Sequence, residues 1–277
     1  MSPLWRDRLH IALAPDRLVL VRVSGGLAPK VLAKTIVPVV AVSPEGGWKP
    51  ALEALAKVLQ VDHQWQDAET SVVLSNYFVR YQLIAWSDEI ETDEEREAYV
   101  RASFSQVYGE GIADWAYSVS ETGRGASWLA AAIDRPLLAQ LEASFGNGRS
   151  KLVSVMPHLM PAFNAARHEI KHNDAWLVQV ENKKLLLGLI LGGHWQSIGS
   201  RQVSDEAWQQ ELPVLLDREW RLNGMGNAPR AVYASAPEAK QAGLDSEGKW
   251  VFHWLRPKLK YGFTGQADVA YAMAVGA

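Results

Sequence analysis

The sequence predicts an α/β protein with two lobes, each built around a β-sheet. Strand-like and helix-like segments alternate along the chain in mixed blocks, and this alternation is typical of α/β folds. Residues 9–38 and 175–203 also resemble each other, because each stretch shows a strand, a turn and two further strands. A chain of 277 residues is long enough for two lobes with substantial cores. A duplicated two-lobe architecture accounts for these observations.

The first part of the chain is predicted to hold three strands, a helix and two more strands. Residues 8–26 alternate between apolar and polar types and are interrupted at Pro15-Asp16, which indicates two strands around a short turn. Residues 30–42 supply a third strand. The segment "ALEALAKVLQ" has apolar residues at helical spacing. Residues 68–86 then contain two strands, separated near Ser75-Asn76.

The middle of the chain shows the clearest helix signals. Thr92 opens a helix whose acidic first turn suits the positive end of the helix dipole, and Gly109 marks its end. Two strands follow, separated by "TGRG". Asp134 is predicted to be the N-cap of the next helix, with Pro136 in its first turn and Gly146 at its end. A strand "KLVSVMP" and a helix "HLMPAFNAARHEIKH" complete this block.

The last part begins with the second hairpin, residues 175–203. Its strands are expected to bury Leu177, Val178, Leu186 and Leu189. A helix through "DEAWQQELPVLLDREWRLNG" contains Pro213, which predicts a kink or a break into two helices. Two short strands, "RAVYASA" and "KWVFHWL", and a small apolar helix at the end of the chain follow.

Composition excludes several classes of protein. The chain has no cysteine, so disulfides, thiolate chemistry and cysteine-based zinc sites are excluded. Its formal charge of -3 provides no overall attraction to nucleic acid or anionic lipid. No apolar run approaches the roughly 20 residues that span a bilayer. The 12 tryptophans either fill cores or anchor interfaces.

The string "HEIKH" is the most motif-like feature of the sequence. On a helix, His168 and His172 would share one face and could bind zinc, with Glu169 as general base. The predicted helix ends directly after His172, however, and no third ligand is evident, since the possible ones, Glu181 and His194, lie in or beside a hairpin. The alternative is a polar helix end with His172 at the negative terminus of the dipole. These three residues are therefore weak candidates for a zinc hydrolase.

Other candidate motifs point away from catalysis. The acidic run "SDEIETDEERE" is typical of a solvated face at a helix start. The glycine-rich spots match neither a phosphate-binding loop nor a dinucleotide-binding fingerprint, and no nucleophile elbow is present. No motif in the chain therefore identifies an enzyme, and we expect no catalytic residue and no cofactor.

The order of elements resembles the actin-like (RNase H-like) ATPase fold, and more narrowly the PilM/GspL group. That group comprises cytoplasmic actin-like components of bacterial type IV pilus assembly and type II secretion. The resemblance rests on "IALAPDRLVLVRV", "VVLSNYFVRYQLIAW", the hairpin 175–203 and the ending "RAVYASAPEA…VFHWL…ADVAYAMAVG". The block from about 92 to 157 is similar to the extra subdomain that the group shares with the division protein FtsA.

The resemblance also implies a division of the chain. It places a first actin-like lobe at 1–160, including the inserted αββαβ subdomain at about 92–157, and a second lobe at 161–277. The chain ends where a GspL-like protein continues toward a membrane helix, so a continuation beyond Ala277 is compatible with the resemblance.

Active members of this fold hold nucleotide with three features, and this sequence departs from the first. The first hairpin of the fold carries Asp-x-Gly, and the matching positions here are Leu13, Ala14 and Pro15. Leu13 cannot hold a metal-bound water, and Pro15 has no N–H to offer to a phosphate.

The other two features depart as well. The second hairpin should repeat Asp-x-Gly, and it has Gln179, Val180 and Glu181. Gln179 lacks the charge that suits Mg²⁺, and Glu181 would direct a carboxylate toward the phosphates. The third feature is a Gly-Gly turn beneath the nucleoside, replaced here by Ala234, Ser235 and Ala236, whose side chains add bulk. We therefore expect a pseudo-ATPase, a fold retained without its ligand.

The resemblance implies a non-catalytic scaffold, cytoplasmic and recruited to the inner membrane, that binds a cytoplasmic segment of an inner-membrane assembly protein. It also implies contact with an assembly ATPase and self-association as a homodimer. It implies no nucleic-acid partner and no membrane span in this chain. Two alternatives stay open at this point: an actin-like protein that binds ATP through a rearranged site, and the zinc hydrolase.

Overall fold

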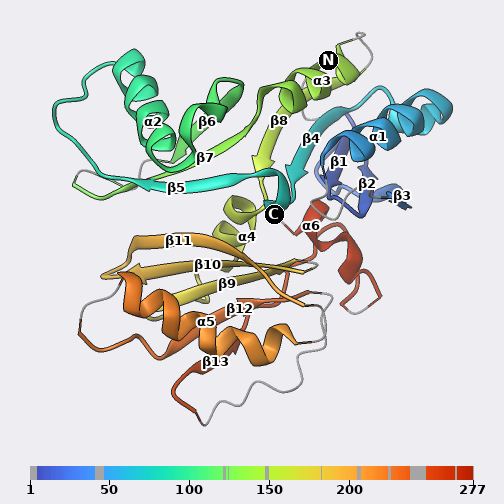
Figure 1. Cartoon of the computed structure of the whole chain (residues 1–277). Coiled ribbons are helices and arrows are strands. Elements are labelled where there is room, and N and C mark those ends of the chain that lie inside the picture. Colours follow the sequence, from blue (N-terminus) through green and yellow to red (C-terminus); the bar gives the residue numbers. More distant parts are fainter. Residues whose placement is uncertain are drawn as a thin grey trace. The chain divides into compact units, whose positions relative to one another are not determined.

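The computed structural model describes residues 5–40, 47–120, 123, 125–146, 150–181, 183–204, 207–223, 226–237, 248–265 and 267–276 (Figure 1). The chain forms two compact units that are interleaved in sequence. Unit 1 comprises Met1–Val79, Ile133–Ala165 and Pro257–Ala277, and unit 2 comprises Arg80–Ala132 and Ala166–Arg256. The predicted α/β class with two sheet-containing lobes is confirmed, since each unit holds a five-stranded sheet.

Unit 1 is built on a mixed sheet with the strand order β3-β2-β1-β4-β8. Its strands are β1 (Arg8–Leu13), β2 (Arg17–Val23), β3 (Val31–Pro38), β4 (Glu69–Leu74) and β8 (Lys151–Pro157). The first three pair antiparallel, whereas β4 and β8 run parallel to β1. The predicted first hairpin and third strand are thus confirmed.

Helices cover the sheet of unit 1. They are α1 (Lys49–Val61), α3 (Arg135–Phe145), α4 (Leu159–Ala166) and α6 (Ala272–Val275), with short 3-10 turns η2 (His63–Trp65), η3 (Asn76–Phe78) and η5 (Val269–Tyr271). In α1, Leu52, Leu55 and Leu59 recur at helical spacing and are buried. Helices α1 and α3 contact each other, and α6 contacts β1 and β2. The C-terminal stretch of the chain therefore completes the first unit.

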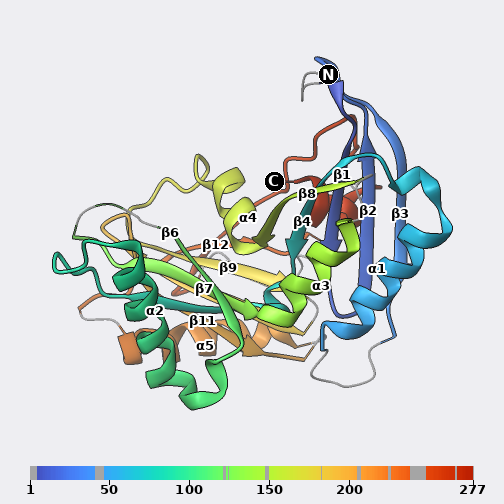
Figure 2. The ribbon, with the colours of Figure 1, turned by 90° about the horizontal axis from the view of Figure 1, so that it is seen from above.

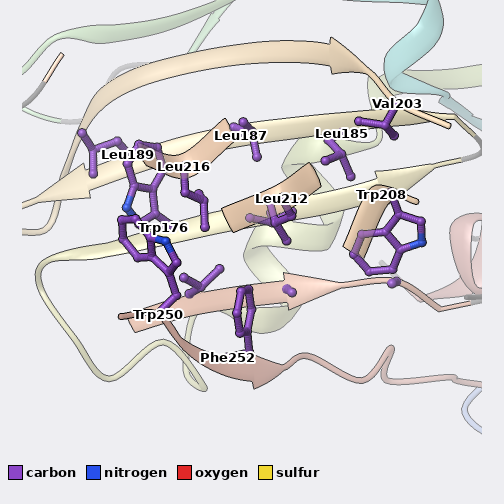
Figure 3. Close-up of a cluster of buried hydrophobic side chains, with 14 residues drawn as sticks. Trp176, Leu185, Leu187, Leu189, Val203, Trp208, Leu212, Leu216, Trp250 and Phe252 are labelled. Carbon is purple, nitrogen blue, oxygen red and sulfur yellow. The ribbon is translucent and has the colours of Figure 1, made fainter. Parts of the chain in front are cut away.

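The sheet of unit 2 has the order β11-β10-β9-β12-β13. Its strands are β9 (Ala175–Glu181), β10 (Lys184–Leu191), β11 (His194–Gln202), β12 (Ala231–Ser235) and β13 (Val251–Trp254). Helix α5 (Trp208–Asn223) packs Trp208, Leu212 and Leu216 against this sheet, where Trp176 and Trp250 meet edge to face (Figure 3). The predicted burial of the hairpin leucines is confirmed, with Leu177, Leu186 and Leu189 all nearly inaccessible.

A second, smaller sheet belongs to unit 2 and has the order β5-β7-β6. Its elements are β5 (Arg80–Ile84), α2 (Asp93–Tyr108), η4 (Gly109–Ile112), β6 (Trp115–Ser120) and β7 (Trp128–Asp134). Helix α2 begins with a capping box between Thr92 and Glu95 and ends at Gly109, which has a φ of 72°. The start and end predicted for this helix are confirmed.

The structure groups part of the predicted 92–157 block differently. Strand β8 pairs with β4 in the sheet of unit 1, and α3 contacts α1 there. In contrast, β5, which precedes the predicted block, pairs with β7 in the small sheet and also contacts β11. The division of the chain near residue 160 stays a prediction.

Helix α5 runs without interruption through Pro213, so the predicted alternative of a break into two helices is wrong, whereas the alternative of a kink stays a prediction. The predicted N-cap of α3, Asp134, is confirmed, although its side chain makes no capping hydrogen bond; its Oδ2 accepts a hydrogen bond from Trp48 Nε1 at 2.8 Å. No helix in the described ranges is both long and apolar enough to cross a membrane.

Candidate functional site

The turn between β1 and β2 is the position of the first nucleotide hairpin. Leu13 is fully buried and stands opposite Leu18 of β2 and Leu74 of β4. Its carbonyl accepts a hydrogen bond from the Ser75 N–H at 2.9 Å. Leu13 is therefore a core residue, and it presents no polar side chain where a metal-bound water would need one.

The turn itself is closed by its own backbone. The Ala14 N–H donates to the Arg17 carbonyl at 3.0 Å, and Pro15 has no N–H. Neither residue thus has a backbone donor available for a phosphate oxygen. A phosphate at the tip of a hairpin is held mainly by such donors, and this turn lacks them at the two positions that follow Leu13.

Buried polar residues lie beside this turn, at the edge where three strands end. Strands β1, β4 and β8 end at Leu13, Leu74 and Pro157, and Ser75 and Asn76 follow β4 with exposed fractions of 1% and 2%. The Ser75 hydroxyl accepts a hydrogen bond from the Tyr77 N–H at 3.2 Å and caps η3. From the sequence, Ser75 and Asn76 were predicted only as a break between two strands. Short polar residues that follow a strand are common in ordinary turns, so their type alone does not indicate a functional site.

The second hairpin, between β9 and β10, contains Gln179 and Glu181. Gln179 is 3% exposed, so its amide lies inside the protein. Glu181 is half-buried and stands opposite Lys184 across the hairpin. Lys183 between them has a φ of 54°, a left-handed conformation that the tight turn requires.

Lys184 explains why a carboxylate is tolerated in this turn. Burial lowers the pKa of Lys184 and the nearby charge of Arg80 adds to that effect, whereas the Glu181 carboxylate opposes it. A half-buried ammonium is favoured by a nearby negative charge, and Glu181 supplies one from within the same hairpin.

The position of the third nucleotide-binding feature, Ala234 to Ala236, lies directly beside the second hairpin. Strands β12 and β9 pair in parallel with Ser235 opposite Gln179 and Ala234 opposite Val178. Ala234 and Ala236 are buried members of the main core of unit 2. Sequence reasoning placed both side chains beneath a nucleoside, but their methyl groups contribute to packing. Of the three residues, Ser235 is the one outside that core.

The predicted zinc motif is not on a helix. Helix α4 ends at Ala166, so His168 and Glu169 lie in a turn and His172 lies in a stretch without regular secondary structure beyond it. The i,i+4 spacing therefore does not place the two imidazoles on one helix face, and His172 is not at a helix terminus. Within the described ranges, no group of three or more histidine, aspartate or glutamate side chains is arranged to hold a metal ion.

His172 instead joins an aromatic cluster that the sequence did not reveal. Its Nδ1 lies 2.7 Å from the Tyr233 hydroxyl, which also accepts a hydrogen bond from the Lys171 N–H at 2.9 Å. The rings of Tyr233 and His253 stack with centroids 4.9 Å apart, as neighbours in the β12–β13 pair. These contacts attach the "HEIKH" stretch to the sheet of unit 2.

Comparisons with solved structures identify the class of fold. The chain is similar to a protein of Bacteroides thetaiotaomicron with an actin-like ATPase fold and unknown function, with a TM-score of 0.58, 10% identity and coverage of 91% of each chain. No protein-family model matches the chain, and no curated protein matches its sequence. The protein thus has the actin-like ATPase fold.

Two further neighbours are components of bacterial assembly machines. The chain is similar to a structure of the PilM-PilN type IV pilus biogenesis complex, with a TM-score of 0.61, 17% identity and coverage of 97% of this chain and 96% of that one. It is also similar to the cytoplasmic domain of EpsL, an inner-membrane component of the type II secretion system of Vibrio cholerae. That match has a TM-score of 0.54, 14% identity and coverage of 96% and 92%. The predicted resemblance to the PilM/GspL group is thereby confirmed at the level of the fold.

Proposed function

We propose that this protein is a scaffold of a bacterial type IV pilus or type II secretion-like machine and that it does not use nucleotide. In this role it lies on the cytoplasmic side of the inner membrane and binds a cytoplasmic segment of an inner-membrane assembly protein. Contact with an assembly ATPase and self-association belong to the same proposal.

The observation that carries the proposal is the state of the hairpins in a chain with an actin-like fold. Leu13 is packed in a core, the Ala14 N–H is used within its own turn, and Glu181 is opposite a half-buried lysine. Each of these features serves packing or internal charge balance. A fold that keeps its hairpins while using their key positions for stability is expected to act through its surface.

The choice of partner is supported by the two assembly proteins among the neighbours. One is a complex of PilM with PilN, and the other is a cytoplasmic domain of an inner-membrane secretion component. Their coverage of nearly the whole of this chain favours a common role for the whole fold rather than for one shared segment.

Equilibrium dialysis against Mg-ATP tests the nucleotide part of the proposal. We expect no binding at micromolar concentration, because the phosphates would meet Glu181 and would find no backbone donor at Ala14 or Pro15. A nucleotide-binding actin-like ATPase, dialysed in parallel, is the positive control. Micromolar binding would contradict this part and favour the alternative of a rearranged ATP site.

Affinity capture tests the partner part. The cytoplasmic segments of inner-membrane proteins encoded beside this gene would be synthesised as peptides and immobilised. We expect one of them to retain the purified protein, and a scrambled peptide of the same composition to fail. If none is retained and the neighbouring genes encode no pilus or secretion component, the proposed role is wrong.

A further inference from the structure

Trp5 is the exception among the tryptophans of this chain. Eight of the 12 are buried, whereas Trp5 is 69% exposed. An exposed indole ring is costly in water, since a large aromatic side chain contributes most when it is covered. Its exposure therefore calls for a functional explanation.

Leu27 is a second exposed apolar residue near this end of the chain, with an exposed fraction of 94%. It belongs to the turn between β2 and β3, and a Cβ built on Gly26 in that turn would lie 3.5 Å from the Trp5 ring. In Figure 2 the strands β1, β2 and β3 run beyond α1 and α3 of the same unit to the end where this turn lies. Trp5 therefore lies against the turn that carries Leu27, and these two exposed apolar residues at one end of the sheet are called the patch below.

The patch is built by close backbone packing. A Cβ on Gly25 would lie 2.5 Å from the carbonyl carbon of Trp5 and 2.7 Å from the carbonyl oxygen of Arg6, so only glycine fits at this position. The Gly25 N–H also donates to the Asp7 carboxylate at 3.2 Å. These contacts hold the stretch of residues 5–8 against the turn and fix where Trp5 stands.

The charges around the patch are mainly basic. Arg6, Arg8 and Lys30 are exposed. The negative charge of Asp7 is paired within the protein, because its Oδ2 accepts hydrogen bonds from Arg22 Nε at 3.0 Å and Arg22 Nη2 at 2.7 Å. Glu69, opposite Arg8 in β4, is half-buried. Glu142 of α3 is exposed and lines the same pocket as Arg6, but within residues 5–8 and 24–30 three exposed cations stand against the one ion-paired Asp7, so these two segments are net positive.

We infer that this end of unit 1, called here the Trp5 tip and formed by residues 5–8 and 24–30, contacts the surface of an anionic lipid bilayer. Tryptophan and leucine enter the boundary between headgroups and acyl chains, and arginine and lysine attract anionic headgroups. The tip matches this chemistry with two apolar side chains and three flanking cations. This contact goes beyond the proposed function, because it involves lipid and no protein partner.

Flotation of the purified protein with lipid vesicles tests the inference. One set of vesicles is phosphatidylcholine alone and the other contains about one third phosphatidylglycerol. We expect the protein to float with the anionic vesicles at low salt, and the double variant Trp5→Ala, Leu27→Ser to lose about tenfold or more of its partitioning. Arg6→Gln with Lys30→Gln should reduce the binding that depends on anionic lipid and on low salt.

The matched controls lie on α5 in unit 2. Val214 is 67% exposed and Arg221 is also exposed. Val214→Ser and Arg221→Gln should leave flotation unchanged. If the native protein does not float with either vesicle, or if the Trp5, Leu27 double variant floats as well as the native protein, the inference is overturned. The vesicles hold no protein, so the outcome is independent of whether the chain binds a partner segment.

A single label locates the contact. Because the chain has no cysteine, Leu27→Cys can carry one environment-sensitive fluorophore, and Leu222→Cys on α5, 66% exposed in the native protein, provides the control. On addition of anionic vesicles, we expect a blue shift at position 27 and none at position 222. Equal shifts, or a shift confined to position 222, would place the contact elsewhere and overturn the inference.

Discussion

At the scale of single residues, His10 shows how a buried polar group couples stability to pH. It lies in β1, its ring stacks on Tyr261 with centroids 5.4 Å apart, and its Nε2 is buried without a hydrogen-bond partner among the described residues. Burial, with smaller effects from the charges of Arg8 and Lys260, lowers the pKa of His10 to about 4. The ring is therefore neutral in the folded protein at pH 7.

The lowered pKa predicts a loss of stability in acid. The unfolded chain binds the proton first, because its histidine has an ordinary pKa of about 6.5. The free energy of unfolding should thus fall as the pH drops from about 6.5 to 4, by roughly 3 kcal/mol in total. His10→Phe keeps the ring stack and removes the titration, so urea unfolding followed by tryptophan fluorescence should show a flatter pH profile.

His194 provides the control for this experiment, because it is exposed on β11. His194→Gln should leave the acid profile as in the native protein. An unchanged profile in the His10→Phe variant would show that other groups cause the acid sensitivity.

At the scale of elements, the strand pair β10–β11 depends on one glycine. A Cβ on Gly188 would lie 2.4 Å from Trp195 Cζ3, and Trp195 is itself 7% exposed. Gly188 thus leaves the space that the indole fills, and the ring has little room to move away.

Gly188→Ala should therefore destabilise the protein by about 1–3 kcal/mol, through overpacking. Gly199→Ala on β11 is the control, because its Cβ would meet only the Arg201 side chain at an ordinary 3.5 Å. Urea unfolding of both variants measures the difference. Equal midpoints for the two variants would show that the sheet adapts to the methyl group.

Elements also show where patterns in the sequence were sufficient. The capping box of Thr92 and Glu95 and the glycine at 109 act within a few residues, and both ends of α2 were predicted correctly. The end of α4 was predicted several residues too late, because residues 167–172 contain no glycine or proline to mark a stop, whereas the contact of His172 with Tyr233 attaches this stretch to the sheet. Tertiary contacts of this kind leave no local signal.

At the scale of the whole molecule, the chain returns to its first unit at its end. Ala274 and Val275 are 3% and 2% exposed and pack with Ala12, Val19 and Val21. Lys34 of β3 also binds Asp268 at 2.5 Å and lies 5.0 Å from the ring centroids of Phe263 and Tyr271. The last stretch of the sequence is thus part of the core of unit 1.

Val275→Asp should destabilise unit 1 by several kcal/mol, since it buries a carboxylate in an apolar core. Hydrogen exchange should become faster in β1 and β2 while β9 and β10 keep their protection. Val214→Asp, at an exposed site, should change neither region. Equal loss of protection in both sheets would show that the two units unfold together.

The sequence by itself determined the class of fold, most of the elements and the loss of the nucleotide pattern. These are recorded in local periodicity, in capping residues and in residue types such as Leu13, Pro15 and Glu181, which act wherever the rest of the chain lies. Only the tertiary structure decided that the C-terminal stretch completes unit 1, that Glu181 stands opposite a half-buried Lys184, and that the exposed Trp5 lies against the turn that carries Leu27. Each of these features depends on burial or on contacts between residues far apart in the chain, and a short stretch of sequence predicts neither.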